Sequence, residues 1–253
     1  MRSRYLLTGA LLLGLVAAAS ADMLLWDNYP GGIDALAQNG AVNMSSERNT
    51  QVVESTWVID DFIIDNGGGG SPTPDGIDTV LTRLDWVGAR QLGTDYGTAD
   101  VIFLDENFNT LLELTDLDYD IVQERDYLDP FARLYEGEIT FGSPISMAML
   151  GESHVYIGVR LVGSGFLEGR NHIVASSVDD TLYGQTEGYV QGAIFGAPPP
   201  AWRPASDVWY GVPDGSTPNI NFEFAFQVYG EQIPEPASLG LLLAGGLLVL
   251  RRR

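Results

Sequence analysis

The chain contains no cysteine and only two histidines. Without cysteine it has no disulfides, no thiol nucleophile and no thiolate-bound zinc, so an exported form would rely on its core or on bound ions. The histidines, His154 and His172, show no H-E-x-x-H spacing, and the chain has no G-x-S-x-G motif, phosphate loop or dinucleotide fingerprint. We expect each histidine to be a hydrogen-bonded residue at a strand edge.

Lysine is also absent, so the charge is strongly one-sided. All 13 basic residues are arginines, against 34 acidic residues, for a formal net charge of −21. Residues 22–230 hold eight of the arginines and 32 of the acids, a net charge of −24. Such a field repels nucleic acid, and we expect no nucleic-acid partner. Two interpretations of the acidity remain open: adaptation of the surface to salt water, or divalent cations that bridge the domain to an acidic polysaccharide.

The first 21 residues have the three parts of a secretory signal peptide. Arg2 and Arg4 form the basic start, residues 6–16 are apolar, and Ala19-Ser20-Ala21 matches an A-x-A cleavage site. The two arginines are not adjacent, which argues against twin-arginine export. We therefore expect an exported chain whose mature form begins at Asp22.

The other end of the chain carries three signals in a fixed order. These are the motif Pro234-Glu235-Pro236, the apolar run 237–250 and the basic end Arg251-Arg252-Arg253. As a helix the apolar run would cover about 21 Å, against about 30 Å of bilayer hydrocarbon, so it is short for a permanent anchor. The arginines predict that the basic end stays cytoplasmic while the preceding domain faces outward.

This order of residues resembles the PEP-CTERM sorting signal of Gram-negative bacteria, over residues 233–253. The resemblance implies that an exosortase, a membrane-embedded transpeptidase-like enzyme, recognises the tail and removes or exchanges it. It also implies membrane anchoring by the apolar helix during transit, followed by delivery to the cell surface or the extracellular matrix. The chain is thus divided into a signal peptide (1–21), an acidic domain (22–230) and a sorting signal (231–253).

Between these signals the sequence predicts short strands separated by turns. Residues 220–229 alternate strictly between apolar and mixed positions, which predicts a half-buried antiparallel strand. Further strands are expected within 23–27, 51–65, 77–89, 99–104, 111–114, 136–141, 153–163, 172–175 and 189–195. Residues 35–50 are expected to be irregular, and residues 115–129 to form a helical turn or an irregular connection. The predicted fold is a single all-β domain, a β-sandwich of the jelly-roll type.

Three segments resemble the β-sandwich domains that are common in PEP-CTERM proteins. They are Trp26-Asp27-Asn28, the segment 58–62 with Asp60-Asp61-Phe62, and the closing segment 224–230, which reads A-F-x-V-x-G from Ala225. This chain has Ile59 where the family often has alanine. The resemblance implies the sandwich fold, and it brings no catalytic residues with it.

One polar segment has the oxygen spacing of a calcium loop. Asp105, Asn107 and Asn109 occupy positions one, three and five, and Asp116 occupies position twelve. Thr110 stands where such loops have glycine, and a polar hairpin turn explains the same residues. No cofactor is required by the sequence, and calcium remains an open alternative.

Adjacent carboxylates at Asp60 and Asp61 are a second candidate for calcium. Neighbouring side chains in a strand point to opposite faces, so both are not expected to reach one ion easily. One of them is instead expected to bond a backbone group or an arginine. The pair is also expected to interrupt the β-rich block of residues 51–65.

Two further groups carry weaker chemical signals. Glu136 and Glu138 lie on one face of a predicted strand, and retaining glycosidases need two carboxyls about 5–5.5 Å apart. In the proline-rich segment 196–219, Trp202, Trp209 and Tyr210 would either stack on sugar rings or close one end of the domain.

These signals favour a non-enzymatic, surface-sorted protein with a structural or adhesive role in the cell envelope or the extracellular polymer. One alternative is a carbohydrate- or calcium-binding module with extracellular polysaccharide as its partner. Another is a glycan-active hydrolase that uses Glu136 and Glu138.

Overall fold

The computed structural model describes residues 23–29, 32–38, 43–49, 54–63, 77–91, 96–126, 132–150, 154–163, 171–179, 187–210 and 221–234. The strands are β1 (Met23–Asp27), β2 (Asn43–Ser45), β3 (Glu47–Asn49), β4 (Glu54–Ser55), β5 (Trp57–Ile63), β6 (Ile77–Gln91), β7 (Tyr96–Leu104), β8 (Thr110–Leu117), β9 (Asp120–Asp126), β10 (Ala132–Ser146), β11 (His154–Gly163), β12 (Asn171–Asp179), β13 (Tyr189–Gln191), β14 (Arg203–Pro204), β15 (Asn221–Phe224) and β16 (Phe226–Pro234). The helices are α2 (Gly32–Gln38), α3 (Met147–Leu150), α4 (Ala205–Tyr210) and the 3-10 helix η1 (Ala193–Phe195). The predicted all-β class is confirmed.

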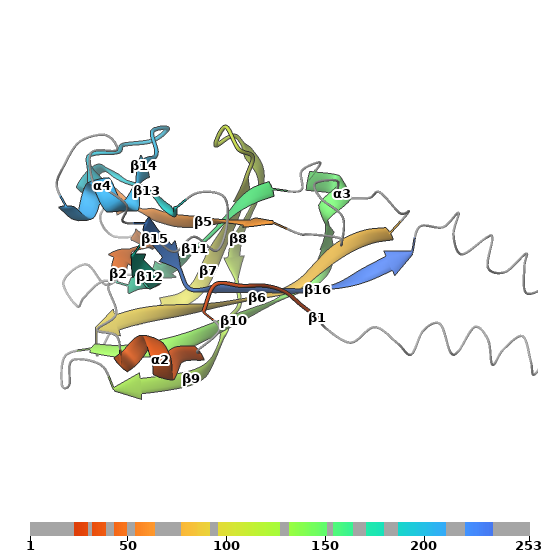
Figure 1. Ribbon diagram of the computed structural model, residues 1–253, viewed down its shortest axis with the longest axis horizontal. Helices are drawn as coiled ribbons and strands as arrows, with labels where there is room; N and C mark the ends of the chain where they lie inside the picture. Colours follow the sequence, from red (N-terminus) through yellow and green to blue (C-terminus); the bar gives the residue numbers. More distant parts are fainter. Residues whose placement is uncertain are drawn as a thin grey trace, which may run out of the picture.

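The strands form two eight-stranded sheets (Figure 1). The first sheet has the order β1-β16-β6-β10-β9, and β12 joins it to β15 and β2. The second sheet has the order β14-β13-β5-β11-β3-β4, with β7 paired to β11 and β8 paired to β7. The pairings are antiparallel apart from β3, which runs parallel to β11. In Figure 1 the strand β5 of the second sheet lies above β6 and β16 of the first.

One buried apolar cluster takes side chains from both sheets. Phe62, Phe103 and Val159 of the second sheet meet Leu84 and Phe226 of the first. Each of these side chains is almost fully removed from water, and burying one phenylalanine stabilises a fold by about 1.5–3 kcal/mol. The two sheets therefore share one hydrophobic core.

A second apolar layer covers the far face of the first sheet. Val87 and Ala89 alternate with the core residue Trp86 along β6, so they point away from the shared core. They pack with Tyr29 and with Ile33 of α2, which Figure 1 shows beside β9 and β10. Because both faces of the sheet are covered here, side chains pointing to either face are apolar in this half of β6.

The far face of the second sheet carries a third cluster. Trp57 and Ile59 of β5 alternate with the core residue Val58 and pack with Tyr156 of β11. Partly buried aromatic side chains from the β7–β8 turn and from the β13–β14 region lie over this face: Phe108, Tyr189 and Trp202.

The structure corrects several local predictions. Residues 35–50, expected to be irregular, contain most of α2 together with β2 and β3. Residues 115–129, expected to be a helical turn or a connection, contain the end of β8 and the whole of β9. The strand β9 pairs with β10, and this ladder overrides the low strand propensity of its acidic residues. Asp60 and Asp61 do not interrupt β5, which runs through both.

The closing strand predicted at 220–229 is two strands. β15 pairs with β12, whereas β16 pairs with β1 and β6. Ala225 joins them, donating its N–H to the Val174 carbonyl at 2.9 Å while its own carbonyl accepts from Val87 N at 3.0 Å. Glu223 and Ala225 are fully buried, so the expectation of a half-buried strand is wrong in this part. The reason is that Ala225 belongs to the apolar layer under α2.

Strand β16 continues beyond the predicted domain boundary at Gly230. It ends at Pro234, whose backbone pairs with Ile77, so the first residue of the predicted sorting motif lies in the sheet. The remaining residues of that motif, Glu235, Pro236 and Arg251–Arg253, lie outside the described residues, as do the leader 1–21 and the apolar run 237–250. Within the described ranges, no helix has the length and apolarity needed to span a bilayer.

Candidate functional site

Three acidic residues meet at one buried point, and we call them the acidic triad: Asp60 and Asp61 of β5 and Glu223 of β15. Each side chain offers a carboxylate oxygen, and the three oxygens lie within 4.8 Å of one another. All three residues are 0% exposed. The expectation that Asp60 and Asp61 could not easily reach one point is therefore wrong.

Asp60 is held by neutral donors. Its Oδ2 accepts from Phe224 N at 2.5 Å and from Asn28 Nδ2 at 3.1 Å, and its Oδ1 accepts from Asp61 N at 2.9 Å. The predicted bond from this pair to a backbone group is thus confirmed. Burial raises the pKa of Asp60 well above its ordinary value, and the charges of Glu223 and Asp61 raise it further.

Asp61 contacts a histidine. Nε2 of His154, the first residue of β11, lies 2.7 Å from Asp61 Oδ2. This is the hydrogen-bonded role at a strand edge that the sequence predicts for His154. The other histidine, His172, lies in β12 and is part of the sheet ladder beside Ser45 and Ala89.

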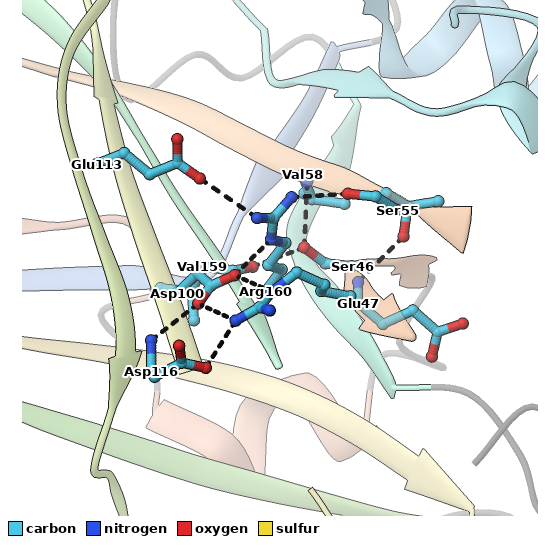
Figure 2. Close-up of polar contacts among 11 residues, drawn as sticks. Ser46, Glu47, Ser55, Val58, Asp100, Glu113, Asp116, Val159 and Arg160 are labelled. Carbon is cyan, nitrogen blue, oxygen red and sulfur yellow. Dashed lines mark hydrogen bonds and ion pairs between the residues drawn. The ribbon is translucent and has the colours of Figure 1, made fainter. Parts of the chain in front are cut away.

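A second buried carboxylate, Asp100 of β7, has charged donors instead (Figure 2). Arg48 Nε and Arg160 Nε donate to Asp100 Oδ2 at 2.7 Å and 2.8 Å, and Arg48 Nη2 donates to Oδ1 at 3.0 Å. Burial raises the pKa of Asp100, but the hydrogen bonds from Arg48, Asp116 N and Arg160 outweigh it and hold the pKa below its ordinary value. Arg160 also lies 4.0 Å from the centre of the Trp57 ring.

Figure 2 shows Arg160 at the centre of these contacts. Its Nη1 donates to Ser55 Oγ at 2.6 Å, and its Nη2 donates to Glu113 at 3.3 Å. Because Arg160 of β11 contacts Asp100 of β7 and these residues of β4 and β8, the network ties four strands together. It is a structural joint between these strands.

The four predicted ligands of the calcium loop do not come together. Asp105 caps its own hairpin turn: its Oδ1 accepts from Asn107 N and Asn109 N, and its Oδ2 accepts from Asn109 Nδ2. Asp116 lies six residues after Thr110 along β8, about 20 Å from the turn. There it accepts from Arg48 Nη2 at 2.7 Å and donates its N–H to Asp100. The hairpin alternative describes residues 105–110 as the structure has them.

Glu136 and Glu138 lie on β10. A third carboxylate, that of Asp85, lies on the paired strand β6. Glu138 pairs directly with Asp85 of β6, which places both side chains on one face. Tyr29 donates its hydroxyl to Glu136 Oε1 at 3.1 Å. Burial raises the pKa of Asp85 to about 7; Arg83 opposes this rise, and Glu138 adds to it.

Of the three aromatic residues predicted to contact sugar or to close the domain, the structure describes the side chain of Trp202 alone. Trp202 stacks on Phe108 of the hairpin turn, with ring centres 6.0 Å apart and planes at 22°. Phe108 also stacks on Tyr156 at 5.0 Å, so the aromatic side chains contact one another over the second sheet. Trp209 and Tyr210 are the last residues of α4, and their side chains lie outside the described part of the chain.

Sequence reasoning missed the residues that complete these centres. Glu223, Asp85 and Asp100 are not among the predicted site residues, and Asn28 enters the sequence analysis only as part of the segment Trp26-Asp27-Asn28. One signal was available for Glu223 and Arg160: each is a charged residue inside an otherwise apolar strand, and a charge in such a place needs a partner when it is buried. The partners themselves lie far away in the sequence.

In comparisons with known proteins, no family model, curated protein or solved structure matches the chain.

Proposed function

We propose that this chain is an exported, non-enzymatic protein with a structural or adhesive role, sorted to the surface or extracellular matrix of a Gram-negative-type bacterium. The observation that carries the proposal is the pair of signals around one acidic all-β domain. A secretory leader at 1–21 precedes the domain, and the order Pro-Glu-Pro, apolar run and arginines follows it. The partners proposed are an exosortase, the membrane through the apolar helix, and extracellular polysaccharide.

The domain itself is proposed to be a β-sandwich of the jelly-roll type. Its support is the shared core of the two eight-stranded sheets. Much of the conspicuous chemistry is used within the fold, which suits a structural role. Asp105 caps its turn, Arg160 and Asp100 join four strands, and Trp202 packs on Phe108.

The sorting proposal is tested by changing the motif without disturbing the sheet. Because Pro234 ends β16, the cleaner variant replaces only Glu235 and Pro236 with alanine. In a Gram-negative host that carries an exosortase, this variant should stay in the membrane fraction, whereas the unchanged chain reaches the surface. A matched control replaces Arg251–Arg253 with lysines and keeps the charge, so it should sort normally. Equal surface exposure of the alanine variant and the unchanged chain would contradict the proposal.

A glycan hydrolase is the second candidate, and one observation favours it. Asp85 and Glu138 face each other across the β6–β10 ladder, and the pKa of Asp85 is about 7. A neutral acid beside a second carboxylate is the arrangement that glycosidases use for general acid catalysis. Hydrolysis of envelope polysaccharides by the unchanged chain, lost in Asp85→Asn and Glu138→Gln, would support this candidate. Activity that survives both substitutions would remove the pair.

A further inference from the structure

The acidic triad brings three carboxylates together without exposure to water. Asp60, Asp61 and Glu223 are each 0% exposed, and one oxygen from each lies within 4.8 Å of the others. Taking carboxylates out of water is costly unless opposite charge or protons compensate. The donors to Asp60 are neutral: one side-chain amide and two backbone N–H groups. Beside them, His154 Nε2 lies 2.7 Å from Asp61 Oδ2.

A fourth residue supplies an independent sign of a missing ligand. Asn28 follows β1 and is 1% exposed, and its amide points at Asp60 with Nδ2 3.1 Å from Oδ2. Its carbonyl oxygen Oδ1 is buried and has no hydrogen-bond partner among the described residues. An unsatisfied buried carbonyl is destabilising. A half-turn of this amide would bring Oδ1 to the place of Nδ2, beside Asp60 Oδ2.

The chemistry of this donor set selects a cation. Carboxylate and amide oxygens are the ligands of Ca²⁺, at 2.3–2.6 Å. Two oxygens bound to one ion at about 2.4 Å lie at most about 4.8 Å apart, which the triad satisfies. Mg²⁺ usually keeps several waters, which a fully buried site does not favour, and Zn²⁺ prefers nitrogen and sulfur ligands.

We propose that Asp60, Asp61, Glu223 and Asn28 Oδ1 bind one Ca²⁺ between the two sheets. The ion joins β5 of the second sheet to β15 of the first and to the segment after β1. These segments are far apart in sequence, so the ion acts as a staple in a chain that has no disulfide. The site is distinct from the hairpin at Asp105 and goes beyond the proposed sorting, which does not depend on it.

The direct test uses the purified full chain. After gel filtration in buffer without chelator, elemental analysis should find about one calcium per chain. After treatment with EDTA, addition of excess CaCl₂ should raise the melting temperature by about 5 °C or more, while the same concentration of MgCl₂ should not. No retained calcium and no shift with CaCl₂ would overturn the proposal, as would an equal shift with MgCl₂.

Variants locate the ion. Glu223→Gln should lose most of the calcium shift, whereas Asp105→Asn and Asp126→Asn should keep it. The Asp126→Asn variant removes one acidic group whose side chain is 78% exposed. The Asp105→Asn variant removes the acidic group of the hairpin turn. A shift that disappears in Asp105→Asn and persists in Glu223→Gln would place the ion at the hairpin and overturn the proposal.

Asn28→Asp keeps the test decisive if Glu223→Gln does not fold. It turns a neutral ligand into a carboxylate, so the calcium Kd should fall about tenfold, while the melting temperature in EDTA should drop because a further buried negative charge joins the triad. A calcium response equal to that of the unchanged chain would show that Asn28 is not a ligand and would overturn the proposed ligand set.

Discussion

Asp60 and Asp100 are both fully buried carboxylates on strands of the second sheet, yet their surroundings are opposite. Asp100 accepts hydrogen bonds from two guanidinium groups, and its pKa is lowered. Asp60 accepts from an amide and two backbone N–H groups while two other carboxylates lie near, and its pKa is raised. The difference teaches that burial alone does not define a role. At Asp100 two guanidinium groups donate to the carboxylate. At the triad the donors to Asp60 are neutral, and His154 lies beside Asp61.

The largest loss of folding stability is expected at Asp100, whose negative charge is paired with two arginines. Asp100→Asn leaves Arg160 and Arg48 charged beside an acceptor that has lost its charge, and Arg160 is largely buried. Breaking a buried pair from one side costs about 3–5 kcal/mol, which urea denaturation at pH 7 would measure. The matched control is Asp116→Asn, whose side chain is 62% exposed, and it should cost less than about 1 kcal/mol. A small loss for Asp100→Asn would break the comparison.

Asp85 is an intermediate case, because its arginine is close but poorly aligned. Arg83 Nε lies 3.1 Å from Asp85 Oδ1, and neither atom has a hydrogen-bond partner within the described residues. Burial raises the pKa of Asp85 from 3.8 to about 7, so between these values the folded chain binds a proton that the unfolded chain releases.

The sign of the pH dependence follows from that proton. Stability contributed by Asp85 is full below about pH 4 and falls as the pH rises to about 7, by at most about 4 kcal/mol. Urea denaturation of the unchanged chain and of Asp85→Asn at several pH values isolates this part. The variant should show a flatter fall with rising pH; parallel curves would contradict the assignment of this proton to Asp85.

The triad should respond in the opposite direction from Asp100 when a charge is removed. In EDTA, Glu223→Gln takes one negative charge away from two others, so stability should stay the same or rise by about 1–2 kcal/mol. Thermal or urea unfolding measures this change. A loss similar to that of Asp100→Asn would mean that Glu223 is compensated by the chain, and the contrast between the two centres would disappear.

The smallest effect is expected at an acidic residue that lies outside both centres. Asp105→Ala removes the acceptor of three hydrogen bonds in the β7–β8 turn. Asp105 is only partly buried, so water can replace the lost acceptor. The expected loss is about 1 kcal/mol in urea denaturation. A much larger loss would show that the hairpin carries more of the stability than a capped turn should.

The sequence predicts what depends on local pattern. Alternation in β11 and β6 and the polar turn at 105–110 anticipated strands and a hairpin that the structure contains. The acidic segment of β9 was not anticipated, because an edge strand pairs through its backbone and tolerates polar side chains. The break at Ala225 was not anticipated either, since it comes from pairing with two different strands.

The triad depends on distance in space rather than in sequence. Asn28 and Asp60 are 32 positions apart, and Asp60 and Phe224 are 164 apart, so no spacing rule joins them. Local geometry even argued against a shared point for Asp60 and Asp61, which lie next to each other in a strand. The approach of β15 to β5 is what brings a third carboxylate to that pair.

The most direct measurement is a crystal structure of the calcium-loaded chain with the anomalous signal recorded. The account predicts one calcium peak within about 2.3–2.6 Å of oxygens from Asp60, Asp61, Glu223 and Asn28, and none at Asp100, where arginines already compensate the charge. An empty triad in crystals that contain calcium, or an ion found only at the hairpin of Asp105, would contradict it.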